Sequence, residues 1–255
     1  MRLAIIPARG GSKRIPGKNI KLFAGQPIIA YSIQAAIASK CFDRVIVSTD
    51  DEMIKAVAED YGAEVPFMRP ANISDDFSTT ADVIKHAIQW LRGTYSDADT
   101  DGNKNLEITN QQTPELVCCL YATAPFVQAS YLREGLEILM QEKCEYVFSA
   151  TTYAFPVQRA IKLDNENRVT MFQPEHLNTR SQDLEEAYHD AGQFYWGRAE
   201  AFMQDKAIFG ETSRIVKLPR HLVQDIDTAE DWQHAELLYQ TYQKSLERQP
   251  QLSQG

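Results

Sequence analysis

Short apolar runs alternate with amphipathic segments along most of this chain, and this rhythm constrains its fold more than any other feature. A run such as "RVIVSTDD" (44–51) is rich in β-branched residues, with three consecutive apolar ones at 45–47, which is typical of a buried strand. Strands of this kind, alternating with helices, predict an α/β fold with a mainly parallel central sheet flanked by helices. The expected strands are 2–6, 44–51, 115–125, 146–154 and 214–219, and the expected helices are 27–39, 52–62, 79–91, 129–142 and a long segment after the acidic turn at 224–227.

Three stretches interrupt this rhythm. Residues 93–114 are polar with almost no apolar pattern, so a mobile insertion is expected there. From about 152 to 195 a predicted hairpin ("QRAIKL", "DNEN", "RVTMFQP") leads into a polar, aperiodic stretch, which indicates an inserted lid or dimerisation segment. Residues 246–255 are expected to be a disordered tail, which leaves 1–245 as a single domain.

Composition narrows the classes of function. The chain has 255 residues, 44% of them hydrophobic, and a net charge of −9, which favours one large core and argues against nucleic-acid or membrane partners. No apolar run approaches the roughly 18 residues of a membrane span, and a cytoplasmic location is expected. The four cysteines, Cys41, Cys118, Cys119 and Cys144, have no C-x-x-C spacing, so we expect reduced core thiols and no zinc site.

A basic, glycine-containing loop, "PARGGSKRIPGKN" (7–19), follows the first strand. In an open α/β sheet, ligands bind beyond the carboxyl ends of the strands. Gly10 and Gly11 would let the backbone N–H groups approach a ligand, Ser12 adds a hydroxyl, and the cations are Arg9, Lys13, Arg14 and Lys18. The loop therefore predicts a polyphosphate site, with a solvated cationic turn as the alternative.

Two familiar phosphate-binding motifs do not fit this loop. Five residues separate Gly11 from Gly17, where a Walker A loop has four, and Asn19 follows Lys18 where that loop has Ser or Thr. The G-x-G-x-x-G pattern of dinucleotide-binding proteins is also absent. A kinase, a P-loop ATPase and an NAD enzyme are therefore disfavoured.

An acidic pair precedes the last predicted helix. Asp225 and Asp227 lie two positions apart, so in an extended segment their side chains point to one side, roughly 7 Å apart. Such carboxylates could hold Mg²⁺ together with substrate phosphates. The alternative is that Asp227 caps the helix, with Glu230 completing a capping box. Asp50 and Asp51 also follow a strand, and a cap is the expected role for at least one of them.

Three segments carry a resemblance to a known family. "IIPARGGSKRIPGKNI", "FDRVIVSTDDEMIKAVAEDYGAEVPFMRP" and "QDIDTAEDWQHAE" resemble the CMP-sugar synthetases, cytidylyltransferases that activate acylneuraminate-type acids. The similarity spans roughly residues 2–92 and 115–240. Within the family, "CCLYATAPF", "FPVQRAIKL" and "NTRSQDLEEAYHDAGQFYWG" are most similar to the pseudaminic acid branch.

The resemblance implies a Rossmann-like nucleotide-diphospho-sugar transferase fold, a homodimer and a reaction. CMP would pass from CTP to the anomeric hydroxyl of a nonulosonic acid, a nine-carbon acidic sugar, releasing pyrophosphate. The loop would grip the triphosphate through Arg9, Gly10, Gly11, Ser12, Lys13 and Lys18. Arg69 and, with an ambiguity of one position, Thr79 would contact the cytosine. The alternative is that Thr79 caps the helix that follows it and Arg69 makes a surface pair. Asp225 and Asp227 would hold Mg²⁺. Arg9, Lys18 and Asp225 are the expected catalytic residues, although Asp225 and a magnesium-bound sugar oxygen both remain candidates for the base.

The sugar site is expected in the middle of the chain. Tyr121 stands where sialic acid enzymes carry a glutamine, which favours pseudaminic acid over sialic acid. Arg159 and Arg180 are the candidates for the sugar carboxylate, with dimer contacts as the alternative. Gln158, His189 and Gln193 could contact hydroxyl or acylamino groups. Two other functions stay open: a synthetase for sialic or legionaminic acid, and a non-catalytic nucleotide sensor.

Overall fold

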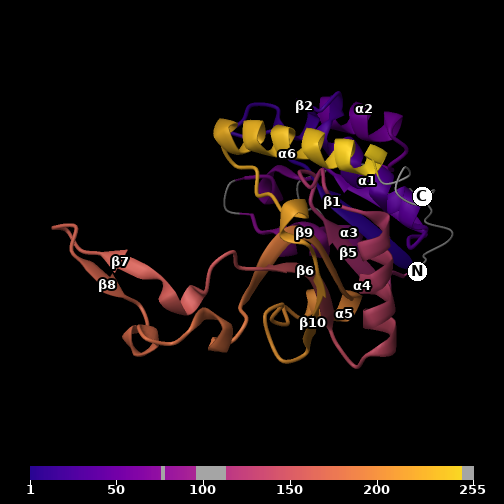
Figure 1. The fold of residues 1–255 in the computed structure, drawn as a ribbon. Helices are drawn as coiled ribbons and strands as arrows, with labels where there is room; N and C mark the ends of the chain where they lie inside the picture. The colour runs from indigo at the N-terminus through magenta and orange to yellow at the C-terminus, as the bar shows by residue number, and fades with distance from the viewer. Residues whose placement is uncertain (76–77, 96–112, 249–255) are drawn as a thin grey trace, which may run out of the picture.

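The computed structural model describes residues 1–75, 78–95 and 113–248. Its centre is a six-stranded sheet in the order β10-β6-β9-β5-β1-β4, in which only β9 runs antiparallel to its neighbours. The prediction of an α/β fold with a mainly parallel sheet is therefore confirmed (Figure 1). The strands are β1 (Arg2–Pro7), β4 (Arg44–Ser48), β5 (Leu116–Leu120), β6 (Tyr146–Thr152), β9 (Tyr188–Arg198) and β10 (Ser213–Lys217).

Helices cover both faces of the sheet. Successive residues of β1 serve opposite cores, because a strand points its side chains alternately to its two faces. Ala4 and Ile6 join the core beneath α1, α2 and α4, while Leu3 and Ile5 join the core beneath α3 and α5. A third cluster packs α6 across the start of α1. The helices are α1 (Ile28–Ser39), α2 (Glu52–Asp60), α3 (Thr80–Leu91), α4 (Ala129–Gln141), α5 (Ala199–Met203) and α6 (Ala229–Arg248).

Smaller elements complete the described chain. Two hairpins are formed by β2 (Leu22–Phe23) with β3 (Gln26–Pro27) and by β7 (Ile161–Leu163) with β8 (Val169–Met171). The four cysteines are buried and unpaired, as expected of core thiols. No helix among the described residues is long and apolar enough to cross a membrane. The 3₁₀ turns are η1 (Lys18–Ile20), η2 (Ala71–Ile73), η3 (Val157–Arg159), η4 (Pro174–His176), η5 (Ser181–Asp183) and η6 (Arg220–Leu222).

The strand β9 corrects the expected inserted segment of about 152–195. It begins at Tyr188 and runs between β5 and β6, so residues 188–195 belong to the central sheet. The sequence hides this strand because polar residues occupy its first part and a bulge breaks its register near Gly192, whose φ is 61°. Trp196 then anchors the strand, fully buried, with its indole N–H donating to the Leu132 carbonyl at 3.0 Å.

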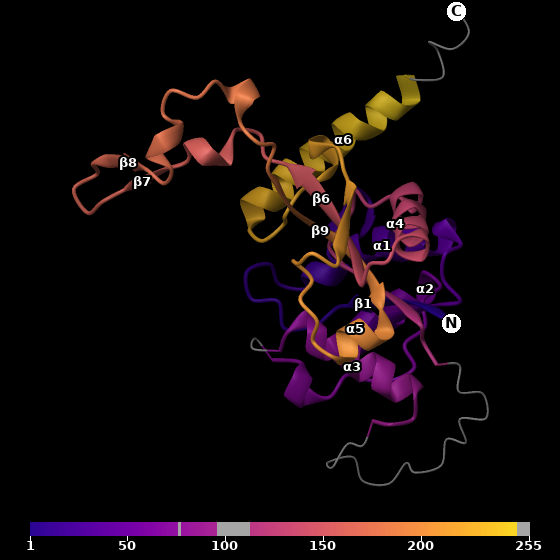
Figure 2. The same cartoon turned by 90° about the horizontal axis from the view of Figure 1, so that it is seen from below.

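Residues 153–187 form an arm that projects from the sheet (Figures 1 and 2). The predicted hairpin is confirmed as β7 and β8, which lie toward its tip. Many of its apolar side chains are exposed: Phe155, Ile161, Leu163, Val169, Phe172 and Leu177. Whether it serves as a lid or a dimerisation arm stays a prediction.

Two other expected segments lie wholly or partly outside the described residues. Of the insertion at 93–114, only residues 93–95 and 113–114 are described. Of the tail expected at 246–255, residues 246–248 belong to α6, which continues to Arg248. Leu246, Glu247 and Arg248 all have high helix propensity. Residues 249–255 lie outside the described chain.

Candidate active site

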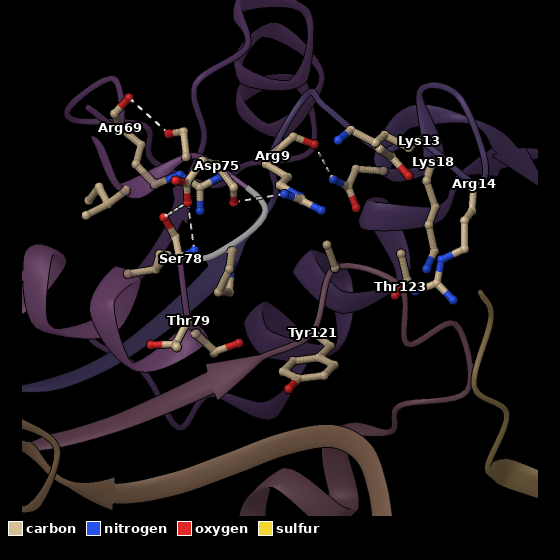
Figure 3. Close-up of a pocket in the computed structure, with 18 of the residues that line it drawn as sticks. Arg9, Lys13, Arg14, Lys18, Arg69, Asp75, Ser78, Thr79, Tyr121 and Thr123 are labelled. Atoms are coloured by element: carbon tan, nitrogen blue, oxygen red, sulfur yellow. Dashed lines mark hydrogen bonds between the residues drawn. The ribbon is translucent and has the colours of Figure 1, made fainter. Parts of the chain in front are cut away.

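A pocket of about 580 Å³ opens where β1 and β5 end (Figure 3). The carboxyl ends of parallel strands meet at one edge of a sheet, which is where such folds bind ligands. The loop after β1, residues on either side of the start of α3, the end of β5 and one residue before α6 line this pocket. The lining residues are Pro7, Arg9, Ser12, Lys13, Arg14, Lys18, Asn19, Arg69, Ile73, Ser74, Asp75, Ser78, Thr79, Thr80, Val83, Tyr121, Ala122, Thr123 and Asp227.

The loop after β1 supplies most of the positive charge. Arg9, Lys13, Arg14 and Lys18 all line the pocket, and Figure 3 shows them along one side of it. The Arg9 guanidinium donates to the Asp75 carbonyl at 2.9 Å, which links the loop to the segment before α3. Four cations around one cavity suit a polyanionic ligand.

The two glycines of the loop differ in their surroundings. The Gly10 N–H donates to the Asp50 carboxylate at 2.9 Å, and a Cβ at Gly10 would lie 2.6 Å from an oxygen of Asp51. Asp51 is fixed there because it caps α2, accepting from the N–H groups of Met53 and Ile54, so the expected cap is confirmed. Gly11 has no atom within 4 Å of such a Cβ. Neither glycine lines the pocket.

Arg69 lines the pocket with a side chain that is almost completely buried. Its side chain is 4% exposed and lies 3.6 Å from the Asp50 carboxylate. Two guanidinium nitrogens, Nε and Nη2, have no hydrogen-bond partner. Burial lowers the pKa of Arg69, and the nearby Asp50 charge opposes that shift. Buried donors without partners are costly, so this side chain is prepared to bind an acceptor group in the cavity.

Thr79 lies in the pocket lining but is engaged as a helix cap. Its hydroxyl and N–H pair with Asp82 in a complete capping box at the start of α3. These bonds lower the pKa of Asp82. Thr80, one residue later, also lines the pocket, within the one-position ambiguity of the expected base contact.

The acidic pair is split by the structure. Asp227 faces the pocket, where its carboxylate lies 2.9 Å from Arg14 and 3.3 Å from Lys18. Asp225 is exposed and is not among the lining residues. The alternative role of Asp227 as the cap of α6 is wrong, because Thr228 caps that helix in a box with Asp231.

The fit of Mg²⁺ rests on Asp227. Among the described residues, no group of three or more His, Cys, Asp or Glu side chains could hold a metal ion by itself. Magnesium, however, often binds through one or two carboxylates and completes its shell with phosphate oxygens and water. A single carboxylate beside a cluster of phosphate-binding cations fits that mode.

The expected sugar contacts fall into two places. Tyr121 lines the pocket, across from the basic loop in Figure 3. Gln193 on β9 lies next to Tyr121, whose N–H donates to the Gln193 carbonyl at 2.9 Å. The Gln193 side chain is buried; its amide N–H donates to the Leu222 carbonyl at 2.6 Å, and its Oε1 has no hydrogen-bond partner. His189 lies at the start of β9, where its ring contacts that of Tyr153.

The other three expected sugar contacts lie on the arm. Gln158 donates to the Glu185 carbonyl at 2.8 Å, and Arg159 donates to the Leu177 carbonyl at 3.3 Å. Arg180 pairs with Asp183 at 2.7 Å. These bonds hold the arm together, and the structure does not bring these three residues to the pocket of their own chain.

Several pocket residues carry no distinguishing pattern in the sequence. Arg14 counts there only as part of the loop's charge, and Asp75, Ser78 and Thr123 have no assigned role. The polar run before α3 is visible in the sequence. Its contact with the loop after β1, made through Asp75 and Arg9, depends on the fold.

Comparisons with known proteins agree with this geometry. A family model described as "Cytidylyltransferase" matches residues 3–97, which contain the basic loop and Arg69. A pseudaminic acid cytidylyltransferase from Campylobacter jejuni is 44% identical over 95% of this chain and 98% of its own length. A CMP-N,N'-diacetyllegionaminic acid synthase from Legionella pneumophila is 32% identical over 96% of this chain and 98% of its own.

Solved structures show the same fold at low identity. A CMP:2-keto-3-deoxy-manno-octonic acid synthetase in complex with CTP matches with a TM-score of 0.64 and 13% identity. The match covers 94% of this chain and 99% of that one. The sequence comparisons thus show the family, and the structural comparison shows the fold.

Proposed function

This chain belongs to the pseudaminic acid cytidylyltransferases, within the acylneuraminate cytidylyltransferase family, and we propose that its pocket transfers CMP from CTP to a nine-carbon acidic sugar. One observation carries this proposal. The basic loop, the buried Arg69 and the Asp227 carboxylate, which come from distant parts of the sequence, line one cavity.

Arg69 suits recognition of cytosine. Cytosine presents O2 and N3 as two neighbouring acceptors, and a guanidinium presents parallel donors in a planar fork. Uracil carries a proton on N3, so the same fork would face a donor and leave one nitrogen unpaired in a buried place. Nε of Arg69 has no hydrogen-bond partner and Nη2 has only the 3.6 Å ion pair with Asp50, which supports Arg69 as the residue that recognises the base.

The phosphate chemistry needs positioning and charge. Arg9 and Lys18, with Ser12 and Lys13, would hold the triphosphate and stabilise the negative charge of the departing pyrophosphate, as the sugar hydroxyl attacks the α-phosphorus in line. The phosphate contact expected of the Gly10 and Gly11 amides stays a prediction, because the Gly10 N–H donates to the Asp50 carboxylate at 2.9 Å and neither glycine lines the pocket. Mg²⁺ would be held by Asp227, with Asp225 as the second candidate, and would neutralise phosphate charge.

Pseudaminic acid is the proposed sugar. The identity of 44% to a pseudaminic acid enzyme exceeds the 32% to a legionaminic acid enzyme and the 29% and 32% to two N-acylneuraminate enzymes. Tyr121 in the pocket supports this choice, since it replaces the glutamine expected of sialic acid enzymes. Use of CTP and four unpaired cysteines favour a cytoplasmic enzyme.

We also propose a homodimer built through the arm. Seven large apolar side chains from Phe155 to Leu177, Val157 among them, are exposed, a concentration typical of a surface that a partner covers. Arg159 and Arg180 lie on this arm. In a dimer they would be available to the sugar site of the partner rather than to their own.

A pyrophosphate-release assay tests the function. CTP, UTP and ATP would each be combined with Mg²⁺ and with pseudaminic, legionaminic and N-acetylneuraminic acids. We expect the highest kcat/KM with CTP and pseudaminic acid, and at least tenfold lower values with UTP. A higher value with another sugar would overturn the choice of acceptor. Binding of CTP without turnover on any sugar would favour the nucleotide sensor.

A further inference from the structure

The end of β4 connects the basic loop to the segment that carries Arg69. The Ser48 carbonyl accepts from the N–H of Ala8, in the basic loop, at 2.9 Å. The next residue, Thr49, accepts from the Arg69 N–H at 2.7 Å and pairs with Met68 in a short parallel bridge. The residue after these two is therefore placed between the two parts of the pocket that would bind the phosphates and the base.

That residue is Asp50, and one oxygen of its carboxylate meets both parts. Oδ1 accepts from the Gly10 N–H at 2.9 Å and lies 3.6 Å from Nη2 of Arg69. In Figure 3, Arg69 lies well apart from Lys18 of the basic loop, and both line the same cavity. Asp50 itself does not line that cavity, so it can influence a ligand there only through the groups that it holds.

The contact with Arg69 depends on charge. The Arg69 side chain is 4% exposed, whereas that of Asp50 is 29% exposed. A guanidinium buried to this extent needs a negative charge nearby, because burial disfavours its ionised form. Asp50 supplies that charge and opposes the effect of burial on the pKa of Arg69. The carboxylate therefore determines on which side of its cavity the guanidinium lies.

We propose that Asp50 is a positioning residue that fixes Arg69 and the basic loop relative to each other, so that base selection and triphosphate binding share one geometry. Its charge would hold the guanidinium fork in place for the cytosine. Its oxygen would hold the bend of the loop through the Gly10 N–H. This inference rests on the proposed function, because it concerns how the same pocket binds CTP.

The two contacts of Asp50 need different chemistry, which allows them to be separated. The contact with Arg69 needs a negative charge, while the contact with Gly10 needs only an acceptor oxygen. Asparagine keeps the acceptor and loses the charge, and alanine loses both. The two variants carry the same charge, so the difference between them isolates the hydrogen bond to the loop. Asp51 caps α2, so both variants keep the start of that helix.

Calorimetric titrations with CTP, UTP and inorganic pyrophosphate test the proposal. In Asp50→Asn, the preference for CTP over UTP, expressed as a ratio of Kd values, should fall about fivefold. Asp50→Ala should show the same fall and should also bind pyrophosphate about fivefold more weakly than Asp50→Asn does. Asp43→Asn is the matched control, because Asp43 accepts from the Arg2 N–H at 2.6 Å and pairs with its guanidinium outside the pocket. It should leave all three affinities unchanged.

A double-mutant cycle shows whether Asp50 acts through Arg69. In an Arg69→Lys background, Asp50→Asn should change the ratio of CTP to UTP affinity by less than twofold, because the fork that it positions is gone. An equal change in both backgrounds would overturn the proposal. A wild-type ratio in Asp50→Asn, or equal pyrophosphate affinities of the two Asp50 variants, would also overturn it. All these readouts are binding constants, so a protein that binds CTP but turns over no sugar would refute the proposed reaction and still decide the role of Asp50.

Discussion

The positively charged side chains of the pocket have partners within the chain. Asp227 pairs with Arg14 and Lys18, Asp50 with Arg69, and the Asp75 carbonyl with Arg9. A triphosphate must therefore compete with acidic and carbonyl groups for the same cations. The competition is closest at Asp227, whose carboxylate would be released toward a metal ion when phosphates take over Arg14 and Lys18.

The variant Asp227→Asn should separate these two roles. Without Mg²⁺, it should bind CTP about two- to fivefold more tightly, because a competing charge is lost from partly exposed ion pairs. With Mg²⁺, turnover should fall about 100-fold, a loss of roughly 2.7 kcal/mol. Calorimetric titration with CTP in a chelator measures the first effect, and pyrophosphate release measures the second.

Asp225→Asn is the matched control for that experiment. Asp225 is exposed and outside the pocket lining, so its loss should not change binding of CTP in the chelator. Weaker binding by Asp227→Asn without metal would contradict the competition. Turnover of Asp227→Asn close to that of wild type in the presence of Mg²⁺ would contradict the metal role of Asp227.

Arg69→Lys should weaken the choice of base. Lysine keeps a positive charge beside Asp50 but has no planar fork, so it cannot pair with two neighbouring acceptors. The ratio of kcat/KM for CTP over UTP should fall about tenfold, and the KM for CTP should rise. Arg44→Lys is the control for folding, because Arg44 pairs with Glu64 away from the pocket. An unchanged ratio in folded Arg69→Lys would remove Arg69 from the base site.

Among the elements, the loop after β1 depends on its contact with α2. The carboxylate that caps α2 leaves no room for a side chain at Gly10, whereas the space around Gly11 is open. The same Asp51 thus holds the helix start and shapes the bend of the loop.

Gly10→Ala and Gly11→Ala should therefore behave differently. A Cβ at Gly10 would force Asp51 to move and would disturb the cap, which costs about 1 kcal/mol when lost. We expect a lower Tm and weaker CTP binding for Gly10→Ala. Gly11→Ala should keep the Tm of wild type, because its Cβ meets no atom. Thermal unfolding and CTP titration of both variants measure this, and equal Tm values for the two would refute the steric argument.

Most elements could be predicted from the sequence, because their apolar patterns are local. Strand β5, "LVCCL", is apolar at every position, and α3 begins at a threonine with an acidic partner three residues later. Strand β9 could not be predicted, since its bulge and its polar first half break the alternation that identifies a strand. The cap of α6 is a nearer miss: Asp227 and Thr228 both suit the position, and only the backbone decides for Thr228.

The sequence predicts a phosphate-binding site of basic residues, but it does not predict which of the basic residues share one pocket. The basic loop and Arg69 carry chemical signals in the sequence, and the fold brings them to one pocket. Arg159 and Arg180 carry the same kind of signal, yet they lie on the arm, because the sequence does not reveal how far residues 153–187 project. Charge identifies candidate ligands, while position depends on contacts between distant segments.

At the scale of the whole molecule, the arm carries apolar side chains that its own chain leaves exposed. Leu163 and Val169 lie opposite each other in the hairpin of β7 and β8, and Ile161 lies two residues before Leu163 on the same face. All three are more than half exposed. A two-stranded hairpin alone is marginally stable in water, so an apolar face on it calls for a covering surface. In a symmetric dimer, a second copy of this chain would supply that surface.

Leu163→Asp should therefore convert a dimer into a monomer. The charge would lie at the centre of the proposed interface, where an unpaired carboxylate is costly to bury, while the fold of the main sheet would be untouched. Light scattering should give the mass of a dimer for wild type and that of a monomer for Leu163→Asp at micromolar concentration. Met53→Asp is the matched control, since Met53 is 65% exposed on α2 and its substitution should leave the dimer intact.

If the arm also serves the partner's sugar site, the monomeric variant should bind CTP normally and lose most of its turnover. A monomeric wild type, or a Leu163→Asp protein that remains a dimer, would refute this role of the arm.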